Sequence, residues 1–355
     1  MSEVAESPLS LYQNGTADQV YNDLIRVLRA NRVAMIHGSP GIGKSAIGHK
    51  AAAECNLLMI DHRMSTSRPE DMTGLPHITN GRSSFNPFAD LFPLEGDPLP
   101  EGYDGWLLFL DEFNSAHKSV QAAAYKLILD RMVGQHKLHP NVRIVCAGNL
   151  ATDRAIVNDM GTAMQSRLVH LEMRVDFESW LKNVAIPFKY DSRIVAYLSR
   201  YNGKLYDFRP DHNEKTFCCP RTWEFVNDLI KDEPVLDMAK DARLLAGTIT
   251  SGVATDFIEF TKVFENLPSL EEVETDPSNA KMASDTGTKW AITAWLSEKA
   301  DDKNFGAITE YMDRMDTTFK ILFYRMIVLR QPGLKMHPAF SKALSTIGKY
   351  LWGNF

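Results

Sequence analysis

The sequence has few cysteines, no long apolar run and no excess of basic charge. Its 355 residues include four cysteines, none of which forms a C-x-x-C pair, and Cys218 and Cys219 are adjacent. This spacing argues against a disulfide framework and a zinc ribbon, and it fits a reducing cytoplasm. No apolar stretch approaches the roughly 20 residues that cross a bilayer, and the amino terminus is too acidic and polar for a signal peptide. We therefore predict a cytoplasmic protein without a membrane partner.

Basic side chains are also in the minority. Lysine and arginine number 39 against 45 aspartate and glutamate residues, which gives a net charge of −6. This balance permits nucleic acid as a partner through a local basic patch but does not favour it. Apolar residues make up 44% of the chain and charged residues 24%, as in an ordinary globular protein with a large core.

The first half of the chain alternates short apolar runs with helical patterns. Five runs are expected to form buried strands, namely Val33–His37, Leu57–Asp61, Trp106–Leu110, Val142–Ala147 and Leu168–Met173. Helical segments separate most of them. This alternation predicts an α/β fold, with a mostly parallel sheet covered by helices on both faces.

Composition divides the chain further. Residues 1–17 are predicted to be a polar lead-in, and 18–175 the α/β core. Strand candidates nearly vanish after that, and helical spacing predicts an all-helical region over 176–265. We expect an acidic, polar linker over 266–284 and a helical carboxy-terminal extension over 285–355.

Two stretches interrupt this pattern. Residues 76–104 are rich in proline and lack periodicity, so we expect a long insertion, which in a compact domain tends to be functional or mobile. Its Phe85, Phe88 and Phe92 fit two roles equally well, gripping a substrate or forming a small satellite core beneath a loop. Residues 204–219, polar and aromatic, have no assigned role.

A glycine-rich motif follows the first predicted strand. Gly38-Ser-Pro-Gly-Ile-Gly-Lys-Ser45 matches G-x-x-x-x-G-K-[ST] at every fixed position. Its glycines let consecutive N–H groups turn toward phosphate oxygens, and the dipole of the following helix adds to the attraction. Lys44 is expected to reach the β- and γ-phosphates, and the Ser45 hydroxyl to bind Mg²⁺. The residues predicted to bind nucleotide here are Gly38, Ser39, Pro40, Gly41, Ile42, Gly43, Lys44, Ser45 and Ala46.

Two acidic residues end the strand candidate Trp106–Leu110. Behind a phosphate-binding loop, Asp111 is expected to hold Mg²⁺ together with Ser45, and Glu112 to polarise the attacking water as general base. Asn149 follows the next strand and is expected beside Glu112, where it can orient that water. The alternatives are a strand end capped by solvated acids and an asparagine in a turn.

These three motifs, in this order, resemble the AAA+ superfamily of ATPases. The narrower similarity is to its MoxR-like branch, which includes the CbbQ and NorQ chaperone ATPases. The likeness extends over roughly residues 30–260 and implies a P-loop AAA+ core with an all-helical lid, ATP and Mg²⁺ as ligands, and hydrolysis of ATP. It also implies that 76–104 is an insert in helix 2 and that 132–140 form the hairpin before sensor 1. Residues 266–355 match nothing in the core family pattern.

The resemblance gives the polar residues their roles. It implies that Lys44 and Ser45 belong to Walker A, Asp111 and Glu112 to Walker B, and Asn149 to sensor 1.

Two arginines complete the implied site. Arg167 occupies the place of the arginine finger, and Arg221 that of sensor 2 in the lid. A guanidinium at a subunit boundary accelerates phosphoryl transfer by about 10³–10⁵-fold, so a finger that acts in trans requires a ring. Arg131, Arg154 and Arg174 are alternatives for the finger. A surface ion pair is the alternative for Arg167, and a simple helix start for Arg221.

Three functions fit these motifs. The resemblance implies a homo-oligomeric ring, expected to be a hexamer, that remodels or activates a protein substrate or adaptor, often one with a von Willebrand A domain. A nucleic-acid motor NTPase similar to the McrB group is an alternative that the acidic charge disfavours. An ATP-gated scaffold is the third, and Glu112 argues against it, since a protein that only binds needs no general base.

Overall fold

The computed structural model describes residues 15–153, 158 and 160–351. The chain divides into two units, Met1–Asp176 and Phe177–Phe355. Most of the predicted lead-in lies outside the described residues, and so does Arg154.

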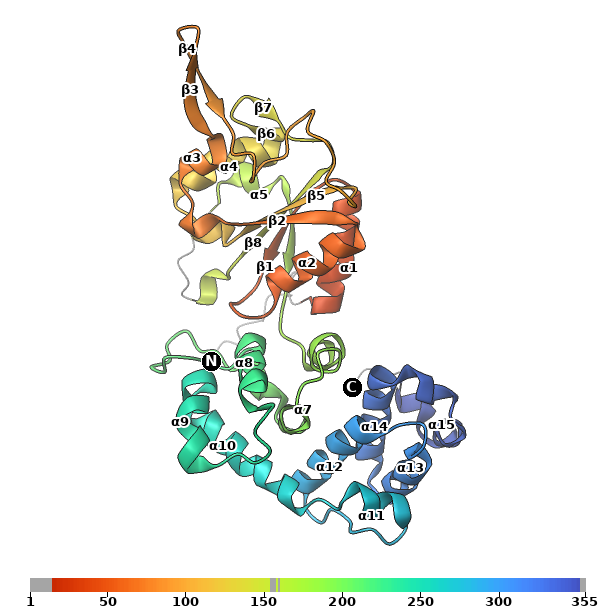
Figure 1. The fold of residues 1–355 in the computed structure, drawn as a ribbon. Coiled ribbons are helices and arrows are strands. Elements are labelled where there is room, and N and C mark those ends of the chain that lie inside the picture. The colour runs from red at the N-terminus through yellow and green to blue at the C-terminus, as the bar shows by residue number, and fades with distance from the viewer. Residues whose placement is uncertain (1–14, 154–157, 159, 352–355) are drawn as a thin grey trace, which may run out of the picture. The chain divides into compact units, whose positions relative to one another are not determined.

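A five-stranded parallel sheet forms the centre of the first unit (Figure 1). Its strands are β1 (Val33–His37), β2 (Leu57–Arg63), β5 (Gly105–Asp111), β8 (Val142–Gly148) and β9 (Leu168–Glu172). They lie in the order β2-β5-β8-β1-β9, and every neighbouring pair is parallel. All five predicted strands are confirmed, because continuous apolar runs mark strands that are covered on both faces.

Helices cover both faces of this sheet. They are α1 (Ala17–Arg29), α2 (Lys44–Glu54), α3 (Pro69–Thr73), α4 (Lys118–Asp130) and α5 (Thr162–Gln165). On β5, Leu107 and Phe109 pack in the core shared with α1 and α2, whereas Leu108 and Leu110 pack in the core shared with α4. Successive side chains of a strand point to opposite faces, so both faces are apolar. The predicted α/β class is confirmed.

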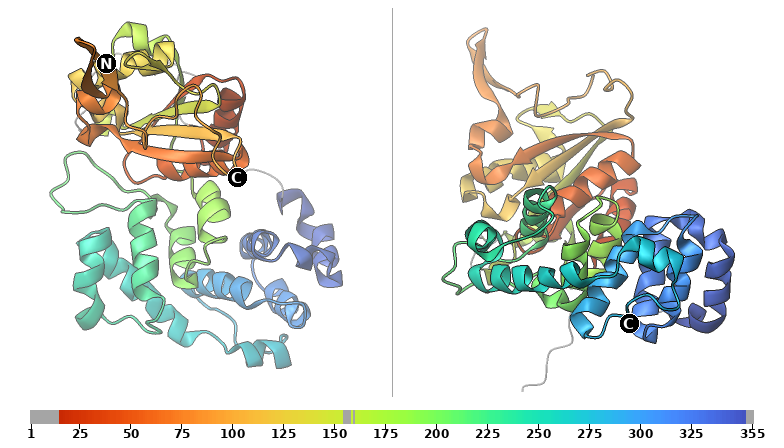
Figure 2. Two further views of the ribbon diagram at one scale, coloured as in Figure 1. Left: turned by 45° about the horizontal axis from the view of Figure 1, so that its top comes forward. Right: turned by 60° about the horizontal axis from the view of Figure 1, so that its bottom comes forward.

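Two antiparallel hairpins extend the first unit beyond its sheet (Figures 1 and 2). Their strands are β3 (Leu75–Thr79) and β4 (Arg82–Asn86), and β6 (Met132–Val133) and β7 (His136–Lys137). A ring nitrogen of His136 lies 3.0 Å from the carbonyl oxygen of Phe85, so a hydrogen bond joins the two hairpins. The hairpin expected before sensor 1 is β6–β7.

The predicted insertion is more regular than expected. Residues 75–86 form the β3–β4 hairpin instead of an irregular loop, and its turn is Asn80-Gly81, with φ angles of 54° and 72°. Positive φ at both central residues is typical of the two-residue turn that Asn-Gly favours. Phe92 is 1% exposed in the core beneath α4, whereas Phe85 is 42% exposed. The insertion phenylalanines therefore do not share one role.

The regular elements of the second unit, over its described residues, are helices. They are α6 (Phe177–Trp180), α7 (Ser192–Arg200), α8 (Pro220–Ile230), α9 (Met238–Ile249), α10 (Ser251–Thr261), α11 (Leu270–Thr275), α12 (Thr286–Lys299), α13 (Phe305–Asp313), α14 (Thr317–Arg330) and α15 (Pro338–Leu351). The helical second half is therefore confirmed. Over the described part of the chain, every helix is too short or too polar to traverse a bilayer.

Residues 266–284 are not the linker that their composition predicts. They contain α11, and Val273 and Ala280 are buried in the core built by α12 to α15. The Tyr311 hydroxyl on α13 donates a hydrogen bond of 2.9 Å to the carbonyl oxygen of Lys281. In addition, α12 packs against both α7 and α14. The acidic side chains lie on exposed positions, and the few apolar ones hold the segment in place.

The buried Arg193 connects the start of α7 to the end of α8. Arg193 lies 2.6 Å from Asp191, and its guanidinium also donates to the carbonyl oxygens of Ile230 at 3.0 Å and Glu233 at 2.7 Å. The last carbonyl groups of a helix have no partner within the helix. Arg193 supplies one for α8.

Candidate nucleotide-binding site

The parallel strands bring the predicted polar residues to one edge of the sheet. β1 leads into Gly38, β5 ends at Asp111 and is followed by Glu112, and β8 leads into Asn149. Because neighbouring parallel strands point the same way, their carboxyl ends meet, and ligands of open α/β sheets bind there. We call this side of the first unit the carboxyl edge.

The glycine-rich loop between β1 and α2 curls as its sequence predicts. Gly41 and Gly43 have φ angles of 75° and 97°, which glycine adopts without the strain of other residues. Gly43 is also the N-cap of α2. The N–H groups and the dipole at the start of this helix favour an anion at the loop.

Lys44 is held inside the curl of this loop. It is 8% exposed, and its ammonium donates to the carbonyl oxygens of Gly38 at 2.7 Å and Ser39 at 2.9 Å. It also donates to Asn149 Oδ1 at 3.1 Å. A buried charge needs such partners, and the bond to Asn149 joins the loop to the end of β8.

The residues expected to hold the metal also meet. The Ser45 hydroxyl donates to Asp111 Oδ2 at 3.1 Å, and these are the oxygen types that bind Mg²⁺ in P-loop enzymes. The residues present therefore fit a magnesium ion. Asp61 on β2 lies close to Asp111. Burial and, second, the charge of Asp111 raise the pKa of Asp61. No sequence signal marked Asp61.

Glu112 bonds to the segment that follows β2. Its carboxylate accepts a hydrogen bond from the Ser65 hydroxyl, and Arg63 Nε lies 3.8 Å from its other oxygen. Arg63 pairs in register with Asp111 across β2 and β5, which places the end of β2 beside Glu112. β8, which leads into Asn149, lies on the other side of β5, so the role of Asn149 in orienting a water beside Glu112 stays a prediction.

Asn149 is fixed instead by a residue that sequence reasoning missed. Asn114 Nδ2 donates to the Asn149 carbonyl oxygen at 2.7 Å, and Asn114 Oδ1 accepts from the Asn149 N–H at 3.1 Å. These two hydrogen bonds hold the backbone of Asn149, and its side chain is the group that accepts from Lys44. The available signal was an asparagine two residues after Glu112.

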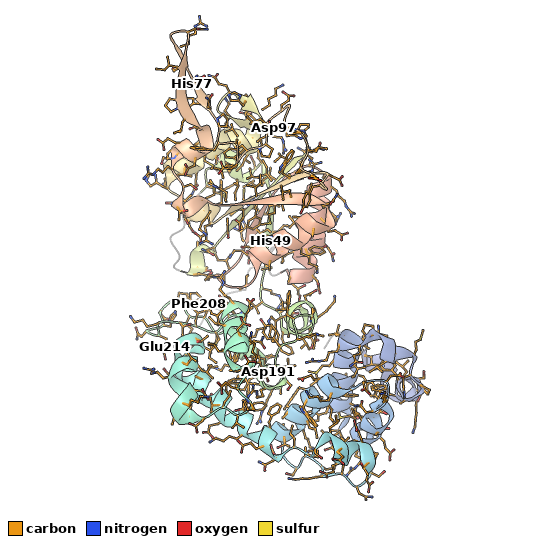
Figure 3. The ribbon with its side chains drawn as sticks, viewed as in Figure 1. His49, His77, Asp97, Asp191, Phe208 and Glu214 are labelled. Atoms are coloured by element: carbon orange, nitrogen blue, oxygen red, sulfur yellow. The ribbon has the colours of Figure 1, made fainter. Side chains whose placement is uncertain are left out.

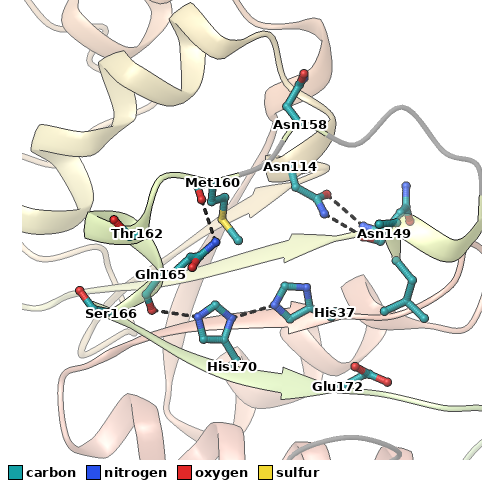
Figure 4. Close-up of a pocket in the computed structure, with 12 residues that line it drawn as sticks. His37, Asn114, Asn149, Asn158, Met160, Thr162, Gln165, Ser166, His170 and Glu172 are labelled. Carbon is teal, nitrogen blue, oxygen red and sulfur yellow. Dashed lines mark hydrogen bonds between the residues drawn. The ribbon is translucent and has the colours of Figure 1, made fainter.

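A pocket of about 850 Å³ opens beside Asn149, with walls from the ends of β1 and β9 and from α5 (Figure 4). Two of its lining side chains bond to each other, since His37 Nε2 and His170 Nδ1 lie 2.9 Å apart. Burial, with smaller contributions from His170 and Lys44, lowers the pKa of His37 to about 4. The ring of His37 is therefore neutral near pH 7.

Arg167 stands away from the carboxyl edge of its own unit. It is exposed, and its guanidinium donates to the Ala163 carbonyl oxygen at 2.8 Å. Within the described part of the chain, no carboxylate pairs with it. The next residue, Leu168, is in register with Val33 at the start of β1. Arg167 therefore lies roughly 20 Å along the strands from Gly38.

The other predicted arginines differ in their surroundings. The Arg131 guanidinium donates to the carbonyl oxygen of Val142, and burial lowers its pKa, so the fold itself uses this residue. Arg174 follows β9. Arg221 is exposed near the start of α8 in the second unit, and its role beside a nucleotide stays a prediction.

No protein-family model and no curated protein matches the chain. Among solved structures, a candidate ATPase from Cytophaga hutchinsonii is 11% identical with a TM-score of 0.36, over 95% of this chain and 90% of that one. The Thermotoga maritima RuvB Holliday junction branch migration motor is 16% identical with a TM-score of 0.35, over 74% and 76%. Brucella abortus NtrX in complex with ADP is 15% identical with a TM-score of 0.35, over 97% and 70%. These values are too low to establish a family or an activity, so function rests on the site itself.

Proposed function

We propose that this chain is a Mg²⁺-dependent AAA+ ATPase that works in a homo-oligomeric ring. The observation that carries the proposal is the meeting of Lys44, Ser45, Asp111 and Asn149 at the carboxyl edge, beside a glycine loop and the start of α2. These groups supply the cation, the metal ligands and the polar contact that phosphoryl transfer from a nucleoside triphosphate requires.

Each residue has a separate task in this proposal. Lys44 neutralises phosphate charge from inside the loop, and Ser45 and Asp111 hold Mg²⁺, which when bound neutralises the charge that develops on the β- and γ-phosphate oxygens. Glu112 takes a proton from the attacking water. To do so, its carboxylate exchanges the hydrogen bond from Ser65 for one from that water.

The place of Arg167 supports a ring. It stands roughly 20 Å along the strands from its own Gly38, which is beyond the reach of one arginine side chain. Yet it is exposed, and it is not engaged in an ion pair with any described carboxylate. We therefore propose that Arg167 completes the site of a neighbouring subunit in a hexamer, and that Arg221 acts as sensor 2.

The proposed partner is a protein. Following the MoxR-like resemblance, we propose that the cytoplasmic ring remodels or activates a protein substrate or adaptor, such as one with a von Willebrand A domain. The β3–β4 hairpin supports contact with a protein, since Leu75, Ile78 and Phe85 are 52%, 75% and 42% exposed on it. Salt-sensitive stimulation of turnover by DNA would instead support a nucleic-acid motor.

ATP turnover per subunit, measured across a wide range of protein concentration, tests this function. We expect turnover to rise steeply as subunits assemble. Lys44→Ala should abolish nucleotide binding, and Glu112→Gln should keep binding while lowering turnover by about 10²–10⁴-fold, the range for loss of a general base. His77→Gln, on the exposed hairpin (Figure 3), is the matched control.

The outcomes separate the candidate functions. A wild-type protein that binds no nucleotide contradicts the proposal. Binding without turnover at any concentration supports the ATP-gated scaffold. Turnover that stays constant in a protein that sizes as a monomer contradicts the ring and the trans role of Arg167.

A further inference from the structure

A hydrogen-bond chain of two histidines lies in the pocket beside the site, and the proposed reaction does not use it. His37 ends β1 directly before Gly38, and its Nε2 lies 2.9 Å from His170 Nδ1. His170 Nε2 in turn lies 2.9 Å from the carbonyl oxygen of Gln165, two residues before Arg167. Figure 4 shows both bonds in one line along the pocket.

The chain has a fixed direction. A carbonyl oxygen only accepts, so His170 Nε2 carries a proton and donates to Gln165. When both rings are neutral, His170 Nδ1 is an acceptor and His37 Nε2–H donates to it. The ring planes differ by 21° with centroids 5.2 Å apart, which fits two rings joined edge to edge. His37 is neutral near pH 7, so with a neutral His170 the bond runs from His37 to His170.

The two bonds lead from the carboxyl edge toward the turn that carries Arg167. His170 is in register with Met35, two residues before His37, so the first bond steps backward along the sheet. The second bond reaches the end of α5, where the Gln165 carbonyl has no partner within the helix. Arg167 follows this turn directly. The residue before the glycine loop is thus tied to the turn that carries the arginine.

We propose that His37 and His170 are positioning residues that couple the glycine-rich loop of one subunit to the Arg167 that serves its neighbour. A shift of the loop at Gly38 moves His37, and the bonds pass that shift to Gln165. Hydrogen-bond networks between two sites are one physical carrier of such coupling. The inference rests on the proposed function, because it takes a nucleotide at the loop and Arg167 as the group that acts in trans.

Hydrogen–deuterium exchange of the full chain tests the coupling without requiring turnover. We expect ADP with Mg²⁺ to slow exchange over 162–167 by about 3- to 30-fold in the wild type, the range in which network contacts modulate coupling. His37→Phe should remove this response while ADP affinity changes by less than about 3-fold. His37→Gln keeps an N–H donor at a similar position and should retain it. His212→Phe, at an exposed position of the second unit, is the control.

Turnover gives a second readout that a merely structural role would not move. In assembled protein, His37→Phe should lower kcat by about 3- to 30-fold with KM unchanged. In the Arg167→Ala background the same substitution should have no further effect on kcat, because the arginine on which the coupling acts is absent.

The outcomes are separable. An ADP response that persists in His37→Phe overturns the inference, and so does a wild type that binds ADP without any response over 162–167. A wild type that binds no ADP contradicts the proposed function and the inference with it. If His37→Phe does not fold, two variants replace it. His170→Asn keeps the acceptor toward His37, and His170→Gln keeps the donor toward Gln165. The inference requires both to lose the response.

Discussion

The two units each bury a cation to the same degree but use it differently. Lys44 in the first unit and Arg193 in the second are each 8% exposed. Lys44 bonds to loop carbonyls and to the side chain of Asn149 at the open carboxyl edge. Arg193 bonds to Asp191 and to carbonyl groups at the end of α8. Burial alone therefore does not separate a functional cation from a structural one.

The partners make the difference. A phosphate oxygen can replace the carbonyl and amide oxygens around Lys44 without unfolding an element. No ligand can replace the helix end that Arg193 fastens, because those carbonyl groups belong to the packing of α7 on α8. We therefore expect substitutions at the carboxyl edge to change turnover, and substitutions at Arg193 to change stability.

The largest effect should follow from Arg167→Ala. Loss of an arginine finger lowers kcat by about 10³–10⁵-fold, whereas the thermal midpoint should hardly change, because the side chain is exposed. Mixing this variant with Glu112→Gln tests action in trans. Each variant keeps what the other lacks, so mixed rings should recover part of the turnover. Mixtures as inactive as either variant alone would contradict a finger that acts between subunits.

Arg193→Ala should lower stability and leave turnover unchanged, the opposite of Arg167→Ala. Removing one partner of a buried pair destabilises a protein by about 3–5 kcal/mol, and here the carbonyl groups of Ile230 and Glu233 also lose their donor. Urea unfolding measures the loss, and turnover per folded molecule should stay at the wild-type level. Lys262→Ala removes the exposed pair with Glu259 and should change stability by no more than about 0.5 kcal/mol. Equal effects of the two substitutions would mean that the buried Arg193 stabilises the second unit no more than an exposed ion pair does.

Features set by local sequence were predictable. The five strands follow from continuous apolar runs, and the curl of the loop from Gly41 and Gly43 within one motif. The Asn80-Gly81 turn is a local signal for a hairpin, within a stretch whose prolines predict an irregular loop. The supposed linker failed for a related reason, since average acidity concealed the single buried Val273 of α11.

Contacts between elements were not predictable. Ser65 meets Glu112, and His37 meets His170, because β2 lies beside β5 and β9 beside β1. Strand order arises from the packing of the whole sheet. A single sequence indicates which residues form a strand, but not which strands lie beside it. The motif therefore indicated Glu112 but could not indicate the hydroxyl that holds it.

The pH dependence of stability sharpens the comparison within the first unit. His37 has a folded-state pKa of about 4 against an ordinary 6.5. Between these values the unfolded chain binds a proton that the folded chain does not, so the free energy of unfolding falls as the pH falls from 6.5 to 4. His37→Gln should remove up to about 3 kcal/mol of this loss. Unfolding curves of both proteins at pH 7 and pH 4 measure it, and identical pH slopes would mean that His37 titrates normally.

The smallest effect concerns the hydroxyl that holds the proposed base. Ser65→Ala removes the hydrogen bond donated to Glu112, which frees the carboxylate to turn toward water and makes it more basic. A single hydrogen bond has a net value of about 0.5–1.5 kcal/mol, so basal kcat should rise by about 2- to 10-fold, with KM unchanged. Ser67→Ala, in the same segment but bonded to His62, is the matched control. A lower kcat for Ser65→Ala alone would mean that Ser65 holds Glu112 in its reactive orientation, and that the polar contacts of the carboxyl edge are already set for chemistry.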